Sequence, residues 1–199
     1  GVTYTTDEVM ISTGGKQAIF NAIVSTMEAG DEAVIPAPFW IAYADTVLYA
    51  GAKPVVVKCP AETGFKITPE MLERAITPAT RWLVLNSPSN PSGAVYTREE
   101  YLGLAEVLRR HPNVAVMVDE MYEHIVFDGV RCDSFVAVCP DMKDRAVIIN
   151  GVSKTYSMTG WRIGFTAAPA ALIKEMTKLQ AQVTSGPSSV GQAAALYTD

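Results

Sequence analysis

The sequence has few of the features that mark small, specialised classes of protein. It contains only three cysteines, Cys59, Cys132 and Cys139, among 199 residues. Neither these cysteines nor the two histidines show the spacing of a disulfide framework or a zinc module, so we expect no metal site. Lysine and arginine number 16 against 21 acidic residues, which gives a formal charge of −5. The chain therefore lacks the net positive charge with which proteins hold nucleic acid or an anionic membrane.

Long apolar runs, repeats and low-complexity segments are also missing. The longest apolar stretch, residues 33–44, is short and contains Pro36 and Pro38, so we do not expect it to span a bilayer. Apolar residues make up 49% and charged residues 19% of the chain, as in an ordinary globular domain. We expect one soluble, cytoplasmic domain. Because the chain starts without methionine and residues 195–199 have the composition of a helix, we also expect a piece of a longer protein.

What the sequence does contain is an alternation of apolar and amphipathic segments. Five runs are as continuously apolar as strands covered on both faces, namely residues 32–36, 54–57, 82–86, 114–118 and 146–150. Helices are expected over residues 16–29, 69–76 and 98–110. Gly30 would end the first helix, Thr68 would cap the second, and Thr97 with Glu100 would form a capping box for the third. This order predicts a three-layer α/β/α domain with a mostly parallel central sheet.

Ligands of such sheets bind beyond the carboxyl ends of the strands. Four segments rich in polar and aromatic side chains follow the expected strands, at residues 38–40, 87–93, 119–122 and 151–154. Because these segments would meet at one edge of the sheet, we look for the functional site there.

Lys154 lies just after the last expected strand. A lysine that is partly desolvated beside another cation, here Arg162, favours the neutral amine that attacks a carbonyl group. An exposed loop lysine without a catalytic role is the commoner situation, so only the surrounding motif can decide between the two interpretations.

Asp119 follows the apolar run 114–118, where an unpaired charge would be costly to bury. We therefore expect a cationic partner. Two candidates are the protonated ring nitrogen of a pyridine cofactor and an arginine or lysine in a structural ion pair, and the residue alone favours the ion pair. Tyr122 would reach the same place if the chain turns helically after Asp119, although simple packing is the more common role.

Two other segments are suited to polar groups of a ligand. Gly14 and Gly15 open the first helix, where free backbone N–H groups bind phosphate well. Their spacing is neither that of a P-loop nor that of a dinucleotide-binding motif, so a nucleotide has no support. Asn90 lies between two prolines, which would hold its amide in a fixed orientation, but a turn without function would have a similar composition.

Together these motifs resemble the class I and II aminotransferases of fold type I, the pyridoxal-phosphate enzymes typified by aspartate aminotransferase. The resemblance rests on Ser-Lys at 153–154 with Arg162 eight residues after the lysine, Asn-Pro-Ser-Gly at 90–93, Asp-Glu-Met-Tyr at 119–122 and Gly-Gly-Lys-Gln-Ala at 14–18. It covers nearly the whole chain in the family's order and spacing. It implies that residues 1–199 are the pyridoxal-phosphate-binding large domain, without the N-terminal segment and the C-terminal small domain.

The resemblance also implies roles around the ring of pyridoxal 5'-phosphate. Lys154 would be the catalytic residue, which forms the internal aldimine and later moves a proton between the substrate Cα and the cofactor C4′. Asp119 would keep the pyridine nitrogen protonated. Tyr122 and Asn90 would hydrogen-bond the ring hydroxyl, and Trp40 would stack on the face of the ring.

Four residues are implied at the phosphate: the backbone N–H groups of Gly15 and Lys16, the hydroxyl of Ser153 and the guanidinium of Arg162. The chain departs from several relatives here. Gly151 stands where they carry a phosphate-binding serine, and Gly14 and Lys16 stand where others carry serine and threonine, so the phosphate site would use fewer hydroxyls. The family's carboxylate-binding arginine lies in the small domain, and residues of a neighbouring subunit complete the site.

The expected function is transfer of an amino group between an amino acid, aspartate or aromatic-like, and a 2-oxo acid, by a homodimer with neither nucleic acid nor membrane as partner. Two alternatives remain open, a lyase of the same fold and a pyridoxal-phosphate-binding regulatory domain. The sequence does not define which amino acid is the substrate.

Overall fold

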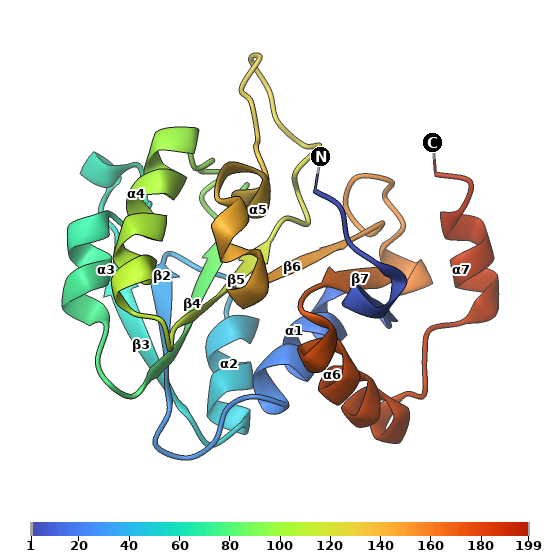
Figure 1. Cartoon of the computed structure of the whole chain (residues 1–199). Coiled ribbons are helices and arrows are strands. Elements are labelled where there is room, and N and C mark those ends of the chain that lie inside the picture. Colours follow the sequence, from blue (N-terminus) through green and yellow to red (C-terminus); the bar gives the residue numbers. More distant parts are fainter. Residues whose placement is uncertain (1, 199) are drawn as a thin grey trace.

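Seven strands form one sheet in the computed structural model, which describes residues 2–198 (Figure 1). The strands are β1 (Val9–Ser12), β2 (Glu32–Ala37), β3 (Lys53–Lys58), β4 (Thr80–Asn86), β5 (Ala115–Asp119), β6 (Ala146–Gly151) and β7 (Gly164–Ala167). Their order across the sheet is β1-β7-β6-β5-β4-β2-β3. Strand β7 is antiparallel to β1 and β6, and all other neighbours pair in parallel. The mostly parallel sheet that the sequence predicts is therefore confirmed.

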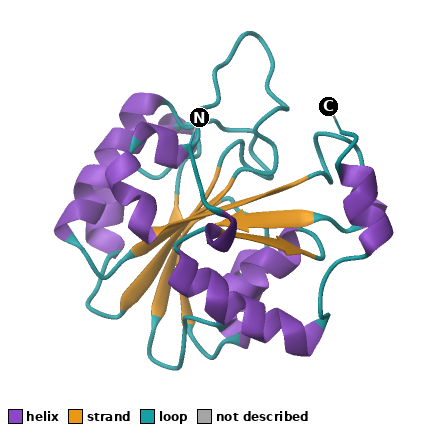
Figure 2. Ribbon diagram, turned by 45° about the vertical axis from the view of Figure 1, so that its right-hand side comes forward, coloured by secondary structure: helices purple, strands orange, loops and turns teal. Residues whose placement is uncertain are grey.

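Helices cover both faces of this sheet. They are α1 (Gly15–Val24), α2 (Ala42–Tyr49), α3 (Pro69–Ala75), α4 (Arg98–Arg110), α5 (Phe135–Val138), α6 (Ala170–Val183) and α7 (Ser189–Ala195). Helices α1, α2 and α6 lie on one face, α3, α4 and α5 lie on the other, and α7 lies beyond the β7 side of the sheet (Figures 1 and 2). None of the helices within residues 2–198 is long and apolar enough to cross a membrane.

The five predicted strands occur within two residues of their expected bounds. One of them is not covered on both faces as predicted, because β3 is the last strand of the sheet and Val56 is 47% exposed. The sequence did not predict β1 and β7, which are only four residues long. Such short strands show too little periodicity to stand out, and tertiary pairing defines them: β7 pairs with β6, and β1 pairs with β7 as an edge strand of the sheet.

The predicted caps of α3 and α4 are present. The Thr68 hydroxyl accepts the Met71 N–H, and Thr97 and Glu100 form the reciprocal capping box. Helix α1 is shorter than predicted and ends at Val24, because the Ser25 and Thr26 hydroxyls turn back to carbonyl oxygens of its last turn. The helix expected over residues 195–199 is wrong beyond Ala195, where α7 ends and the exposed Leu196 and Tyr197 follow; residue 199 lies outside the described residues.

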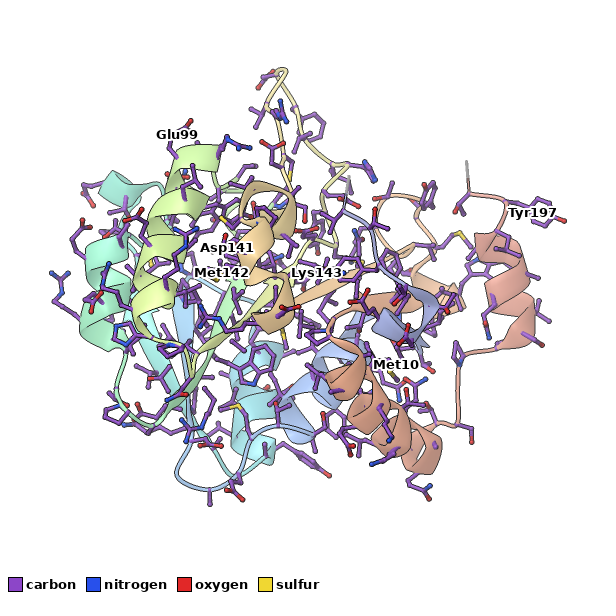
Figure 3. All side chains as sticks on the ribbon, viewed as in Figure 1. Met10, Glu99, Asp141, Met142, Lys143 and Tyr197 are labelled. Carbon is purple, nitrogen blue, oxygen red and sulfur yellow. The ribbon has the colours of Figure 1, made fainter. Side chains whose placement is uncertain are left out.

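The apolar side chains form two cores, one on each face of the sheet. Figure 3 shows side chains filling the spaces between the ribbons of the helices and the sheet. Strand β5 contributes to both because side chains alternate along a strand. Val116 and Val118 pack with α4 and α5, whereas Met117 packs on the side of α1 and α2. This alternation decides where the polar residues after β5 point.

One edge of the sheet collects the ends of the parallel strands. The antiparallel direction of β7 brings its first residue to that edge as well, beside the beginning of α1. A Cβ atom on Gly164 would lie 2.5 Å from backbone atoms of Gly14 and Gly15, so only glycine permits this approach. The start of α1 and the segment before β7 are thus held together.

Candidate active site

A cavity of about 270 Å³ opens at this edge of the sheet. All nine site residues that the sequence singled out line it: Gly15, Lys16, Trp40, Asn90, Asp119, Tyr122, Ser153, Lys154 and Arg162. Sequence reasoning missed five further lining residues: Ile19, Tyr43, Asn86, Met121 and Thr159. Segments from five parts of the chain therefore converge on one space, while the roles given to their side chains stay predictions.

Asp119 ends β5 and is 5% exposed. Its carboxylate accepts a hydrogen bond from the Tyr43 hydroxyl at 2.6 Å and another from the Met121 N–H at 3.1 Å. Burial raises the pKa of this carboxyl group, and the two hydrogen bonds act against the rise. Within residues 2–198 no lysine, arginine or histidine forms an ion pair with it. The structural ion pair that the sequence favoured is therefore wrong.

Tyr43 is the most informative of the missed residues. It lies on α2, is fully buried, and packs edge-on against Trp40 with ring centroids 5.6 Å apart. Burial and the neighbouring Asp119 carboxylate raise the pKa of its hydroxyl, so the hydroxyl stays protonated and donates to Asp119. The sequence feature that could have placed Tyr43 at the site is its position three residues after Trp40, because this spacing places both rings on one side of a helical turn.

The chain turns directly after β5. The Glu123 N–H donates to the Glu120 carbonyl, and the Ile125 N–H donates to the Tyr122 carbonyl. This turn brings Tyr122 back to the cavity, as its spacing from Asp119 predicted. Burial, and then the Asp119 carboxylate, raise the pKa of the Tyr122 hydroxyl. Tyr122 therefore offers a protonated hydroxyl to the same space.

Lys154 and Lys16 are the two lysines of the cavity. Lys154 follows β6, and its Nζ lies 5.8 Å from the centroid of the Tyr122 ring. It lines the cavity but is exposed rather than partly desolvated as predicted, because it lies in the turn after β6. The Nζ of Lys16 lies over the Trp40 ring, 5.0 Å from its centroid. Neither ammonium group pairs with a carboxylate in the described part of the chain.

Arg162 and the beginning of α1 form another wall. Arg162 has a left-handed backbone (φ 56°), and its Nη1 donates to the Thr159 carbonyl at 2.8 Å. Gly14, with φ 85°, allows the guanidinium to lie against the α1 terminus, since a Cβ there would collide with it. Among residues 2–198 this guanidinium makes no ion pair. A cation and free helical N–H groups thus face one place, which suits an anion.

Two strand ends complete the lining. Ser153 is buried between β6 and Lys154. Gly151 closes β6, and a Cβ on it would come within 2.7 Å of the Ile163 carbonyl oxygen. This contact favours glycine at the position where the resemblance places a phosphate-binding serine in several relatives. On β4, the side-chain amide of Asn86 forms hydrogen bonds with the backbones of both Asn90 and Asp119. In the sequence, only its position as the last residue of an expected strand could have indicated that Asn86 lies at the site.

The three-layer fold is that of aspartate aminotransferases over about half of their length. The crystal structure of the aspartate aminotransferase from Rhizobium meliloti matches with a TM-score of 0.97 at 52% identity, over 98% of this chain and 49% of that one. An aromatic aminotransferase from Pyrococcus horikoshii matches with a TM-score of 0.90 at 38% identity, over 94% of this chain and 50% of that one.

The sequence agrees with the fold. The family model for aminotransferase class I and II matches residues 1–197, and the chain belongs to this family. It is 54% identical to the aspartate/prephenate aminotransferase of Cereibacter sphaeroides over 98% of its length. The chain spans about half the length of the curated relatives that it matches, 49% in this case.

Proposed function

We propose that this chain is the cofactor-binding large domain of a pyridoxal-phosphate-dependent aminotransferase about twice its length, called the parent protein below. The enzyme would move an amino group between an amino acid and a 2-oxo acid. One observation carries the proposal: a single cavity combines a buried carboxylate that has no ion-pair partner among residues 2–198, an accessible lysine, and an arginine beside a helix N-terminus. The family and the names of the relatives support it.

The buried carboxylate fits pyridoxal phosphate best. An ionised Asp119 needs a positive partner, because burial without one raises its pKa. A protonated pyridine nitrogen supplies that partner. The carboxylate in turn stabilises the protonated form of the ring nitrogen. When bound, the cofactor supplies a ring that accepts electrons from the substrate Cα. Asp119 would therefore increase the capacity of the ring to accept electrons, while its carboxylate keeps the hydrogen bonds from Tyr43 and Met121.

The cofactor's phosphate fits the opposite wall. The backbone N–H groups of Gly15 and Lys16 belong to the first turn of α1, where the helix dipole favours an anion. The Arg162 guanidinium can bind two phosphate oxygens at once, and the Ser153 hydroxyl supplies one more donor. These groups would anchor the cofactor and determine how far its ring enters the cavity.

Lys154 would do the chemical work. Its nitrogen would hold the cofactor covalently, and after release it would take the proton from the substrate Cα and return it to the cofactor. Tyr122 and Asn90 would bind the ring hydroxyl and orient the ring. Trp40 would cover one face of the ring and exclude water from it.

Lys16 and the names of the relatives support a proposal for the substrate class. We propose an acidic amino acid such as aspartate, because the Lys16 ammonium lies at the cavity wall over Trp40 and offers a positive partner for a side-chain carboxylate. Relatives at about 50% identity are named aspartate or aspartate/prephenate aminotransferases. A cytoplasmic homodimer remains part of the proposal.

The decisive experiment maps the covalent attachment site. The parent protein is loaded with pyridoxal phosphate, reduced with borohydride and digested, and the modified peptide is identified by mass spectrometry. We expect the label on Lys154 and on none of the other seven lysines of this chain. Lys154→Ala should carry no label, while Lys16→Ala, the matched control from the same cavity, should keep it. A label on another lysine, or a wild-type protein that takes none, would refute the proposal.

A further inference from the structure

One side-chain amide joins two sides of the candidate active site. The Asn86 Oδ1 accepts the backbone N–H of Asn90 at 2.6 Å, and the Asn86 Nδ2 donates to the Asp119 carbonyl oxygen at 2.8 Å. Asn86 is the last residue of β4 and pairs in register with Asp119, the last residue of β5. The amide therefore connects the loop after β4 to the end of β5.

Two contacts join the loop that carries Asn90 to the end of β5: the Asn86 amide, and the Ser87 N–H, which donates to the same Asp119 carbonyl at 3.1 Å. Elsewhere the loop is closed by its own hydrogen bonds, from the Ser89 N–H to the Ala94 carbonyl and from the Gly93 N–H to the Ser89 carbonyl. Its far end is held by the Tyr96 N–H, which donates to the Ser87 hydroxyl. The Asn90 N–H instead finds its acceptor in Asn86. Only a side chain that both donates and accepts, as an amide does, can make the two contacts.

We propose that Asn86 is a positioning residue, which holds Asn90 at a set distance from Asp119 across the cavity. This inference rests on the proposed function, in which Asn90 donates to the ring hydroxyl of the cofactor and Asp119 binds the ring nitrogen. A donor held in place stabilises the ionised ring hydroxyl. Releasing Asn90 should therefore raise the pH at which this hydroxyl ionises.

The test compares Asn86→Leu with Asn21→Leu in the parent protein. Leucine is close to asparagine in size and removes both halves of the connection. Asn21 is a matched control, because its buried amide donates to Gln180 between α1 and α6, outside the cavity lining. The first measurement needs no cofactor: amide exchange at Asn90 should be about tenfold faster in Asn86→Leu, as expected for loss of one hydrogen bond, and unchanged in Asn21→Leu.

The second measurement is the pH titration of the bound cofactor's absorbance. Its midpoint should rise by about one unit in Asn86→Leu, a tenfold change in the ionisation equilibrium, and should stay at the wild-type value in Asn21→Leu. If Asn86 acts through Asn90, the double variant Asn86→Leu/Asn90→Ala should titrate like Asn90→Ala alone.

Two results would overturn the inference. One is a wild-type midpoint and wild-type Asn90 exchange in Asn86→Leu, even if the protein becomes less stable, since that describes a purely structural contact. The other is an equal shift of the midpoint by Asn86→Leu with and without Asn90. Failure of the proposed function would look different, because the wild-type protein would then show no covalent cofactor at Lys154 while the exchange measurement could still succeed.

Discussion

Two consecutive acidic residues, the last of β5 and the one after it, face opposite sides of the sheet. Asp119 points to the side of α2, where Tyr43 donates to it, and borders the cavity. Glu120 points to the side of α4 and α5, where its carboxylate accepts the Phe135 N–H at 3.1 Å. Both are nearly inaccessible, with 5% and 4% of their surface exposed, and burial raises the pKa of both.

The difference lies in what adjoins each carboxylate. Asp119 is next to a space that a cationic group can enter, whereas Glu120 is enclosed by protein at the start of the long loop between β5 and α5, which projects at the top of Figure 1. Among residues 2–198 neither forms an ion pair. Burial and a raised pKa are thus common to a candidate catalytic group and to a structural one, and the adjoining cavity distinguishes them.

The largest effect should come from removing the charge on the cavity side. Asp119→Asn keeps the size of the side chain but leaves no carboxylate for the cofactor ring. The covalent link at Lys154 should still form, while the rate of proton removal from the substrate Cα should fall about 1,000-fold, or about 4 kcal/mol, as for loss of a key preorganised electrostatic group. Single-turnover kinetics of the parent protein with excess aspartate measure this rate.

Glu120→Gln is the matched control for that experiment. It neutralises the neighbouring carboxylate on the other face and should leave the rate within a few-fold of wild type. Equal losses of rate in the two variants would show that the carboxylate beside the cavity has no greater role in proton removal than the carboxylate on the other face.

The second effect concerns stability and belongs to Glu120. Burial raises its pKa from 4.5 to about 7, so the folded protein keeps a proton that the unfolded chain releases above pH 4.5. The free energy of unfolding therefore falls as pH rises from 4.5 to 7, by up to about 3 kcal/mol. Outside this pH range the ionisation of Glu120 contributes no pH dependence to the free energy of unfolding. Glu120→Gln should remove this part of the pH dependence.

Chemical denaturation of wild type and Glu120→Gln at pH 5 and pH 8 checks the sign. Between these two pH values the wild type should lose more stability than the variant. A variant that loses as much as the wild type would show that Glu120 ionises normally in the folded protein.

The smallest effect should come from the hydrogen bond that Tyr43 gives to Asp119. Tyr43→Phe keeps the ring that packs on Trp40 and removes only the hydroxyl. The Met121 N–H remains as a donor, so we expect a loss of about 1.5 kcal/mol, or roughly tenfold, in cofactor affinity. Equilibrium titration with pyridoxal phosphate measures it, with Tyr122→Phe as the comparison from the other side of the ring. An unchanged affinity would place Tyr43 among simple packing residues.

Much of this architecture could be read from the sequence because the signals are local. Continuous apolar runs in β2, β4, β5 and β6 marked buried strands, and Thr68 and Thr97 marked helix starts. Lys154, Asp119 and Arg162 could be named because each lies at a set distance from a strand end or from another residue of its motif. These features depend on neighbours within a few positions, so the order of residues alone determines them.

The tertiary structure decided the contacts between distant segments. Tyr43 reaches Asp119 across 76 positions, and Asn86 reaches it across 33. It also showed that Asp119 has no structural ion pair within residues 2–198 and that Lys154 is exposed, two points on which the sequence interpretation was wrong. The physical reason is that burial and partner choice follow from how strands pair and which face each side chain meets. The residue sequence of this chain therefore determined which groups are at the site, and the packing of β4, β5 and α2 determined what each group touches.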